Sequence, residues 1–377
     1  MSEGKGAVRP AVSIVIPCYN VEAYLPEVLD SVLGQTLENI EAMCVNDGST
    51  DGTLDVIKSY AARDSRIVII DKPNGGYGHS MNKGMDMATG EYIGIVESDD
   101  YILPTMYEKL YAAAEENNVD FVRSDFTKFK TGANGERVFW EEKLTPHSEY
   151  YNTVMNPADN LDVFNMQMLN WTGIYRTDFI REHNIRHHES PGASYQDNGF
   201  WFQTFCWAKR IYAVPEAFYC YRQDNAASSI NQNNKVFCMP DEYAWIRDFL
   251  AAHPALEQRF IGVFHYKKMH NLNFAFSLLA PEFQMPFLER YAAEYREASA
   301  KGELDESLFW PEEWTAVNKI MADPQAYCAE YNFQIEKQAA YNKAQSGGSL
   351  ALFRFHAKYD GLAETLKIVA RRLGEDR

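Results

Sequence analysis

Residues 92–100 read Tyr-Ile-Gly-Ile-Val-Glu-Ser-Asp-Asp, an apolar run that ends in three carboxylates within four residues. The apolar half is typical of a strand that is buried in a sheet. Carboxylates this close repel one another unless a cation lies between them, and hard divalent cations such as Mg²⁺ or Mn²⁺ prefer oxygen ligands. The stretch therefore predicts a strand whose carboxyl end carries a metal site. The simpler alternative is that one of these acids caps the next helix.

The same order of strand and polar turn recurs on the N-terminal side of this stretch. Residues 12–17, 40–45 and 67–70 are short apolar runs, and apolar residues at helical spacing follow each of them. This alternation predicts an α/β fold with a mostly parallel central sheet. In such sheets ligands bind at the carboxyl ends of the strands, so we expect the polar residues after successive strands to share one site.

Residues 74–84 form a glycine-rich turn that leads into a predicted helix. Glycines permit close approach of the backbone, and a helix N-terminus can face an anion. The segment lacks the Gly-Lys-Ser/Thr of a phosphate-binding loop and the spacing of a dinucleotide-binding motif. The turn is therefore only weak evidence for a phosphate site.

The pattern loosens from residue 127 to residue 230 and becomes mainly helical from residue 231 onward. Asp197 lies among polar and aromatic residues, where it could act as a general base near an acceptor or simply cap a helix. Arg222 ends an aromatic run that is typical of a core strand, and an arginine at that position could face a phosphate.

Composition excludes some classes of function. The chain has 377 residues with 36 Lys and Arg against 53 Asp and Glu, a formal net charge of −17, and no basic stripe is visible. Broad binding of nucleic acid is therefore disfavoured. The six scattered cysteines favour reduced thiols. No run is long and apolar enough to span a bilayer, and we expect a cytoplasmic protein.

The C-terminal segment has apolar residues on one helical face, with three basic residues beside them (Leu362, Leu366, Val369 and Leu373; Lys367, Arg371 and Arg372). The simpler interpretation is a helix docked on the rest of the chain. Peripheral contact with the inner face of a membrane is the alternative.

Taken together, the motifs resemble those of the family 2 inverting glycosyltransferases of GT-A fold. The resemblance extends over residues 11–230, with four motifs in the family's order. Residues 15–20 look like the opening strand and its P-x-Y-N turn, and residues 45–51 look like the V-x-D-G-S-x-D motif. Residues 74–84 look like the N-x-G loop, and residues 97–100 look like the D-x-D-D metal site.

The resemblance implies a role for each matching residue. Asp197 would be the catalytic base, and Asp99 with Asp100 would hold Mn²⁺ or Mg²⁺. The residues expected to bind the nucleotide sugar are Pro17, Tyr19, Asn20, Asp47, Gly76, Asn82, Glu97, Ser98 and Arg222. The aromatic and imidazole side chains of Trp171, His188 and Trp201 would shape the acceptor pocket.

The sequence departs from the family pattern at two positions. Glu97 stands where the family usually has Asp, which leaves open whether it contacts metal or ribose. Gln196 stands where the family often has Glu, immediately before the proposed base. Both departures keep a second hypothesis open, a non-catalytic protein that binds nucleotide sugars.

The implied activity is metal-dependent, inverting transfer of a sugar from a nucleotide diphosphate donor, with UDP-sugar expected, to a hydroxyl of a glycan or lipid-linked acceptor. Polysaccharide biosynthesis is the setting that the family suggests. A sugar-phosphate nucleotidyltransferase is a further alternative, but it would carry a basic, glycine-rich loop after the first strand. We expect a glycosyltransferase domain over residues 1–230, with a donor half (11–126) and an acceptor half (127–230), followed by a helical extension over 231–377.

Overall fold

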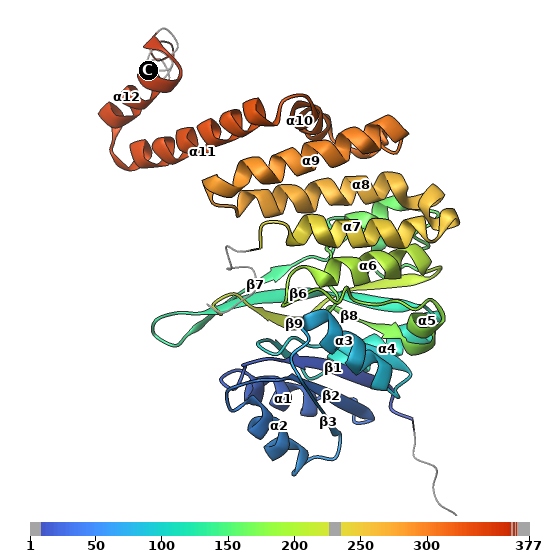
Figure 1. Cartoon of the computed structure of the whole chain (residues 1–377). Helices are drawn as coiled ribbons and strands as arrows, with labels where there is room; N and C mark the ends of the chain where they lie inside the picture. The colour runs from blue at the N-terminus through green and yellow to red at the C-terminus, as the bar shows by residue number, and fades with distance from the viewer. Residues whose placement is uncertain (1–8, 226–234, 363–364, 366, 368–377) are drawn as a thin grey trace, which may run out of the picture. The chain divides into compact units, whose positions relative to one another are not determined.

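A computed structural model describes residues 9–225, 235–362, 365 and 367. The first half alternates between strands and helices as expected (Figure 1). Its elements are β1 (Val12–Cys18), α1 (Leu25–Leu33), β2 (Ile40–Asp47), α2 (Thr53–Ala61), β3 (Ile67–Lys72), α3 (Tyr77–Met87), β4 (Tyr92–Ile95), β5 (Tyr101–Ile102), α4 (Met106–Asn117), β6 (Phe121–Thr131) and β7 (Arg137–Glu142).

The remaining elements are mainly helical. They are the 3₁₀ turns Ser148–Tyr150 and Leu161–Asn165, then β8 (Gly173–Arg176), α5 (Thr177–Glu182), α6 (Gln196–Trp207), β9 (Ile211–Arg222), α7 (Cys238–Ala251), α8 (Pro254–Ser277), α9 (Pro281–Lys301), the 3₁₀ turn Glu306–Leu308, α10 (Pro311–Ala322), α11 (Pro324–Ser346) and α12 (Ser349–Tyr359).

One sheet organises these elements, with the strand order β3-β2-β1-β4-β8-β6-β9-β5 and with β7 paired to β6. β1 pairs in parallel with β2 and β4, β2 pairs in parallel with β3, and β6 pairs in parallel with β9. β8 is antiparallel to both β4 and β6, so β6 and β9 run in the same direction as β4. The expected α/β fold with a mostly parallel sheet is confirmed, and the antiparallel β8 lies inside it.

Local sequence explains why these elements form. Every residue of β1 is buried, as expected for a strand covered on both faces. In α1 the buried residues follow helical spacing: Leu25, Val28, Leu29 and Val32. Helix α4 ends where Asn118 adopts a left-handed conformation with φ of 44°, which breaks the hydrogen-bond pattern. The core therefore follows the apolar periodicity of the sequence.

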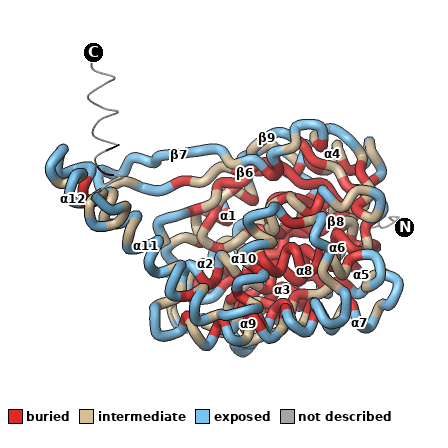
Figure 2. Tube along the Cα trace, turned by 90° about the horizontal axis from the view of Figure 1, so that it is seen from above, coloured by how far each residue is buried: buried red, intermediate tan, exposed pale blue. Residues whose placement is uncertain are grey.

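Strand β7 differs from the rest of the sheet because five of its six residues are exposed (Figure 2). It pairs with the second half of β6, which continues to Thr131. Apolar patterning does not mark this half as a strand. The reason is that this half of β6 is only partly buried, so its sequence lacks a continuous apolar run.

Packing divides the chain into two compact units, Met1–Ala275 and Phe276–Arg377. The first contains the whole sheet, and the second contains α9 to α12. The predicted boundary near residue 230 follows the extent of the motifs and stays a prediction. Most of the predicted C-terminal amphipathic face, including Leu366, Val369 and Leu373, lies outside the described residues.

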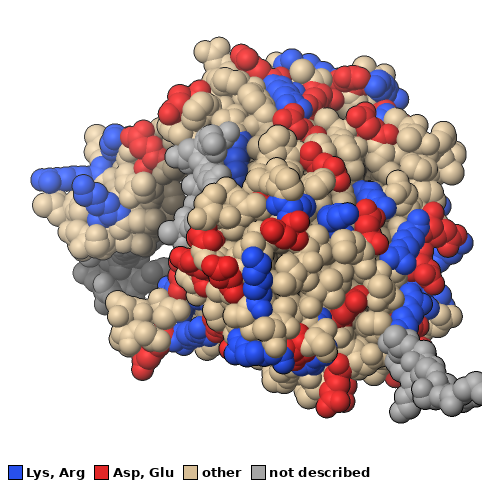
Figure 3. All heavy atoms as spheres, turned by 60° about the horizontal axis from the view of Figure 1, so that its bottom comes forward, with Lys and Arg blue, Asp and Glu red and all other residues tan. Residues whose placement is uncertain are grey.

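Charged side chains of both signs are intermixed on the face drawn in Figure 3. None of the helices within the described residues has the length and apolar character needed to cross a membrane.

Candidate active site

The turns after β1 and β2 lie against each other at the carboxyl edge of the sheet. Asn20 adopts φ of 53°, and its side-chain oxygen accepts a hydrogen bond of 2.8 Å from the amide of Thr50. Its own amide donates to Oγ of Ser49 at 3.1 Å. Pro17 is buried in β1, whereas the ring of Tyr19 is 51% exposed. These contacts join the first two predicted motifs and leave an aromatic face open to solvent.

Asp47 ends β2 and anchors the glycine-rich loop. Its two carboxylate oxygens accept hydrogen bonds from the amides of Gly75 (2.8 Å) and Gly76 (2.9 Å), and it forms a buried ion pair with Lys72. The side chain of Asn74 donates to its backbone carbonyl at 3.0 Å. The predicted contact of Asp47 with the nucleotide base stays a prediction, because in this structure both oxygens order the loop.

The glycine-rich loop packs against residues 188–192. Gly76 has φ of +87°, and the amide of Tyr77 donates to the carbonyl of Gly192 at 2.9 Å. A Cβ atom at Gly78 would lie 1.9 Å from the carbonyl oxygen of His188. Glycine is therefore required there for close approach of two backbones.

Asn82 joins the same two segments from inside helix α3. Its amide nitrogen donates to the carbonyl of His187 and to Oε1 of Glu189, both at 2.9 Å, and its oxygen accepts from the amide of His187. The Asn82 side chain is buried. Its polar atoms thus hold residues 187–189 in place, and its predicted role in binding the nucleotide sugar stays untested.

Residues 97–100, in the turn after β4, differ in how deeply they are buried. Asp100 is fully buried, and its oxygens accept from Oη of Tyr219 and the amide of Arg222, each at 2.7 Å. Ser98 is also buried. Asp99 is half-buried, and one of its oxygens accepts from the side chain of Asn225 at 2.7 Å. Asp100 therefore shapes the turn, and Asp99 is the better placed of the two to offer an oxygen to a cation.

Arg222 locks this turn from strand β9. Its Nε donates to the carbonyl of Asp99 at 2.7 Å, and one terminal nitrogen pairs with Glu27 at 2.7 Å. The guanidinium also lies over the rings of Tyr24 and Phe129. Arg222 is therefore engaged with the protein itself, and its predicted contact with donor phosphate stays a prediction.

Glu97 is held by a residue that the sequence did not single out. Oη of Tyr77 donates to Oε1 of Glu97 at 2.7 Å, and the side chain of Asn170 donates to the same hydroxyl at 3.1 Å. Burial raises the pKa of Glu97 to about 8, and the charges of Asp99 and Asp197 add to this. Glu97 thus lies among like charges with no cationic partner among the described residues.

Asp197 lies in the first turn of helix α6 and is half-buried. Burial, followed by the charge of Glu242, raises the pKa of Asp197 to about 7, although nearby backbone amides partly oppose this. A carboxylate with a pKa near neutrality can accept a proton from a substrate.

The charges of the acids in the two motifs act on one side chain, Tyr221. Burial raises the pKa of Tyr221, and the charges that raise it further are those of Asp100, Asp99, Asp197 and Glu97. The first element that contributes these acids is the turn after β4, and the second is the N-terminus of α6. The fold therefore brings together acids that are about 100 residues apart in the sequence.

Carboxylate oxygens suit Mg²⁺ and Mn²⁺, and a cation would offset the repulsion that raises the pKa of Glu97. Within the described ranges, no group of three or more His, Cys, Asp or Glu side chains is arranged to hold a metal ion. A cation bound here would therefore need further oxygen ligands from another molecule, such as a diphosphate.

The three predicted acceptor residues have different environments. Trp171 is 5% exposed and stacks on Tyr219 with ring centroids 4.2 Å apart. His188 is partly exposed and its Nδ1 lies 2.9 Å from Glu242. Trp201 is fully buried and stacks on Phe205 at 4.0 Å, so its ring offers no surface to an acceptor in this structure.

Sequence patterns did not indicate a role for three residues that contact the site: Tyr77, Asn170 and Glu242. Tyr77 follows the glycines directly, and its position at the start of a helix was the available signal. Glu242 lies beyond the resemblance, and no pattern marked it.

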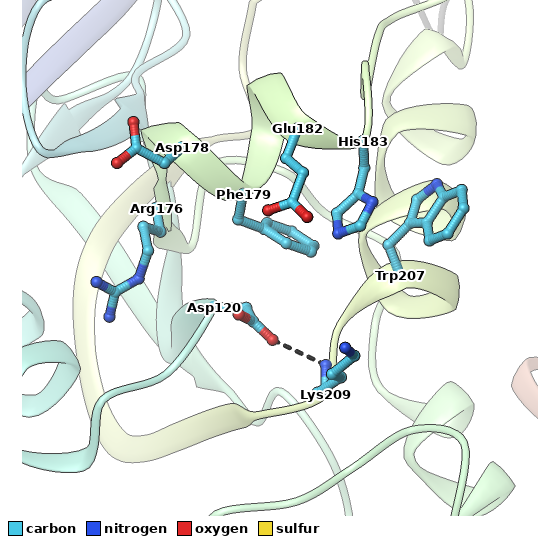
Figure 4. Close-up of a pocket in the computed structure, with 8 residues that line it drawn as sticks. All are labelled: Asp120, Arg176, Asp178, Phe179, Glu182, His183, Trp207 and Lys209. Carbon is cyan, nitrogen blue, oxygen red and sulfur yellow. Dashed lines mark hydrogen bonds between the residues drawn. The ribbon is translucent and has the colours of Figure 1, made fainter.

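A surface pocket lies elsewhere in the first unit (Figure 4). It is lined by Asp120, Arg176, Asp178, Phe179, Glu182, His183, Trp207 and Lys209. Asp120 accepts from the amide of Lys209 at 2.8 Å and directly precedes β6, whereas the acidic cluster follows the end of β4. Because β6 and β4 run in the same direction, this pocket lies at the opposite edge of the sheet from the acidic cluster.

Part of the chain is similar to known proteins. Residues 13–170 match the model of the family "Glycosyl transferase family 2". The uncharacterized glycosyltransferase EpsJ of Bacillus subtilis is 32% identical over 220 residues, which is 57% of this chain and 62% of EpsJ. Chondroitin synthase of Pasteurella multocida is 44% identical over 99 residues, which is 26% of this chain and 10% of that enzyme.

Among solved structures, that of S. aureus TarS 1-349 in complex with UDP-GlcNAc has a TM-score of 0.50 and 20% sequence identity. The match covers 82% of this chain and 90% of that one, and it bears on the fold alone. The matched stretch spans less than two thirds of the length of EpsJ. Residues 13–170 are therefore similar to glycosyl transferase family 2, and the fold of the chain is GT-A-like.

Proposed function

We propose that this chain is an inverting glycosyltransferase that moves a sugar from a UDP-sugar to a hydroxyl of a glycan or lipid-linked acceptor. The observation that carries the proposal is that acids from the turn after β4 and from the N-terminus of α6 all act electrostatically on Tyr221. One element would serve the donor and the other the acceptor. UDP is chosen because TarS, which shares the fold, was solved with UDP-GlcNAc.

The donor would bind at the carboxyl ends of β1, β2 and β4. The exposed ring of Tyr19 can stack on a base, and the turn at Asn20 and Asp47 lies beside it. Asp99, with Glu97 near it, would hold Mn²⁺ or Mg²⁺, which when bound offsets the charge of the departing diphosphate. Asp100 and Arg222 keep the backbone of Asp99 in place.

Asp197 would accept the proton of the acceptor hydroxyl. The acceptor oxygen then forms a bond to the anomeric carbon while the bond from that carbon to the diphosphate oxygen breaks, and UDP leaves with the electron pair. One base and one displacement invert the anomeric configuration. Holding both partners in line supplies much of the rate.

The proposed organisation assigns residues 11–126 to the donor and residues 127–230 to the acceptor. The contacts of Asn82 and Gly78 with residues 187–192 support a joint site for the two halves. The proposed extension from residue 231 onward includes α7.

The test is release of UDP from a panel of UDP-hexoses and UDP-N-acetylhexosamines in the presence of Mn²⁺, with and without saccharide acceptors. Transfer by the wild-type chain and a loss of about 10²- to 10⁴-fold in Asp197→Asn would support the proposal. Asp197→Asn should still bind UDP, measured by calorimetry. Binding of UDP-sugars without any release of UDP by the wild-type chain would favour the non-catalytic alternative.

A further inference from the structure

Helix α7 lies outside the family-matched residues but contacts the candidate active site through Glu242. This side chain is 1% exposed. One oxygen accepts a hydrogen bond of 3.0 Å from the amide of Gly199 in the first turn of α6, and the other lies 2.9 Å from Nδ1 of His188. A single buried carboxylate therefore links α7 to the helix turn that carries Asp197 and to a predicted acceptor residue.

Close packing fixes this arrangement. A Cβ atom at Gly199 would lie 2.4 Å from Oε1 of Glu242 and 2.5 Å from the ring of Trp245, so any larger residue would have to displace these side chains. The ring of Trp245 stacks on His188 in a nearly parallel orientation, with centroids 5.2 Å apart. The side chain of Asn198 also contacts Met239 on the same helix.

His188 is the more exposed member of the pair. Its side chain is 24% exposed, against 1% for Glu242. Its backbone carbonyl abuts Gly78, and Asn82 fixes the residues on either side. Its Nε2 makes no hydrogen bond to any residue that the structure describes. The imidazole thus has one nitrogen fixed by a buried acid and the other available to a ligand.

We propose that Glu242 is a positioning residue: it orients His188 so that Nε2 contacts an acceptor hydroxyl, and it steadies the turn that carries the base. This inference rests on the proposed function. It makes α7 part of the catalytic unit, although the helix begins after both the family match and the sequence resemblance end. An acid that holds one nitrogen of an imidazole sets which nitrogen carries the proton.

Electrostatics support the geometry, since the charge of Glu242 helps to raise the pKa of Asp197. The other ionisable groups that interact with Asp197 are Tyr77, Glu97, Tyr175, Tyr195, Tyr221 and Tyr243. Of the groups that act on Asp197, Glu242 and Tyr243 lie on α7, and Glu242 is the one of these two that also pairs with His188. Removing its charge should therefore lower the pKa of Asp197.

The decisive variant is Glu242→Gln, which keeps the shape of the side chain and an oxygen for the amide of Gly199. We expect the acceptor KM to rise about tenfold, because one charge-assisted hydrogen bond is lost. The affinity for UDP should be unchanged. The acidic limb of the pH profile should move to lower pH. The matched control is Asp248→Asn, an exposed acid on the same helix, which should behave like the wild-type chain.

Two measurements separate positioning from mere structural support. His188→Gln combined with Glu242→Gln should be no worse than the more impaired single variant, because both remove the same interaction. A Glu242→Gln chain that keeps the wild-type acceptor KM and pH profile overturns the proposal. So does one whose activity and thermal midpoint fall together while the pH profile stays in place.

A readout without turnover distinguishes this inference from the proposed function. In ¹⁵N-histidine spectra, with His188 assigned from the His188→Gln variant, we expect Nδ1 of His188 to carry the proton, and the Glu242→Gln variant to lose that preference. If Nδ1 of His188 carries the proton but no UDP-sugar is turned over, the proposed function fails, whereas the proposed pairing of Glu242 with His188 is supported. If Nδ1 of His188 is unprotonated in the wild-type chain, the proposed pairing of Glu242 with His188 is wrong, whatever the activity.

Discussion

The hydroxyl of Tyr77 donates a hydrogen bond of 2.7 Å to Oε1 of Glu97, which joins the first turn of α3 to the end of β4. The longer side chain of Glu97, where the family usually has Asp, therefore has a dedicated partner. This contact links the glycine-rich loop to the acidic cluster.

Replacement of Tyr77 by Phe should reduce kcat/KM for the donor by about 10- to 100-fold. The reason is that a hydrogen bond to a charged group is worth about 1.5–3 kcal/mol, and Glu97 would lose its fixed orientation. Steady-state kinetics with a varied donor measure the effect. Tyr60→Phe is the control, because Tyr60 makes a similar bond of 2.8 Å to Asp30 on the surface. Equal effects of the two variants would contradict the role of Tyr77.

The activity should fall as the pH decreases through about 7. Burial and the charge of Glu242 raise the pKa of Asp197 to about 7, and the proposed base must be ionised to accept a proton. The pH dependence of kcat/KM for the donor reports the free enzyme and checks this expectation. An acidic limb near the ordinary aspartate pKa would exclude Asp197 as the group that titrates.

The same shift has a consequence for stability. Because the pKa of Asp197 is higher in the folded than in the unfolded chain, the folded state loses stability as the pH rises from about 4 to about 7. Asp197→Asn should therefore raise the melting temperature at pH 8 more than at pH 4. Thermal unfolding at the two pH values measures the difference, and an equal effect at both would show that the pKa is not raised.

The two acids after β4 should respond differently to substitution. Asp99→Asn should make UDP affinity independent of Mn²⁺ and leave the melting temperature nearly unchanged, since Asp99 is half-buried and makes one side-chain contact among the described residues. Asp100→Ala should lower the free energy of unfolding by about 2–4 kcal/mol, because the buried hydroxyl of Tyr219 and the amide of Arg222 would lose their acceptor. Calorimetry and chemical unfolding measure the two effects. The assignment is wrong if the Asp100 variant is stable and metal-independent while the Asp99 variant keeps its response to Mn²⁺.

Gly78→Ala should destabilise the chain by more than about 2 kcal/mol, because a new Cβ would collide with the backbone oxygen of His188. Gly135→Ala is the control. Gly135 has φ of +82° but no atom within 4 Å of the added carbon, so only a strain of about 1–2 kcal/mol is expected. Urea unfolding compares the two, and a larger effect at Gly135 would mean that the loop at Gly78 yields easily.

The fold could be predicted from the sequence wherever a clear apolar run was followed by a polar turn. β1, β2 and β4 are almost entirely buried, so their apolar runs are clear in the sequence, and the polar residues that follow them lie at the carboxyl ends of neighbouring strands. The roles of single residues were harder to predict. Asn82 and Trp201 lie in or beside matched motifs, yet Asn82 bonds to residues 187 and 189, and Trp201 is enclosed by aromatic rings. Both outcomes depend on contacts across more than 100 residues or on packing depth, which local spacing does not contain.

Glu242 shows the opposite case. It lies in a helix with an ordinary amphipathic pattern, and its proposed role comes from tertiary contacts with Gly199 and His188. A buried acid among the surface acids of a chain with 53 Asp and Glu has no signature in the sequence.

Strand β8 lies between β4 and β6 in the sheet, yet it begins at Gly173, after the last residue that matches the family model. A chain cut at residue 170 would leave β4 and β6 without the neighbour that joins them. The segment recognised as homologous and the segment able to fold are therefore different lengths of polypeptide. Chimeras that transfer this donor site to another enzyme should include the chain as far as Arg222, the end of β9. A shorter segment would lack strands that pair in the middle of the sheet.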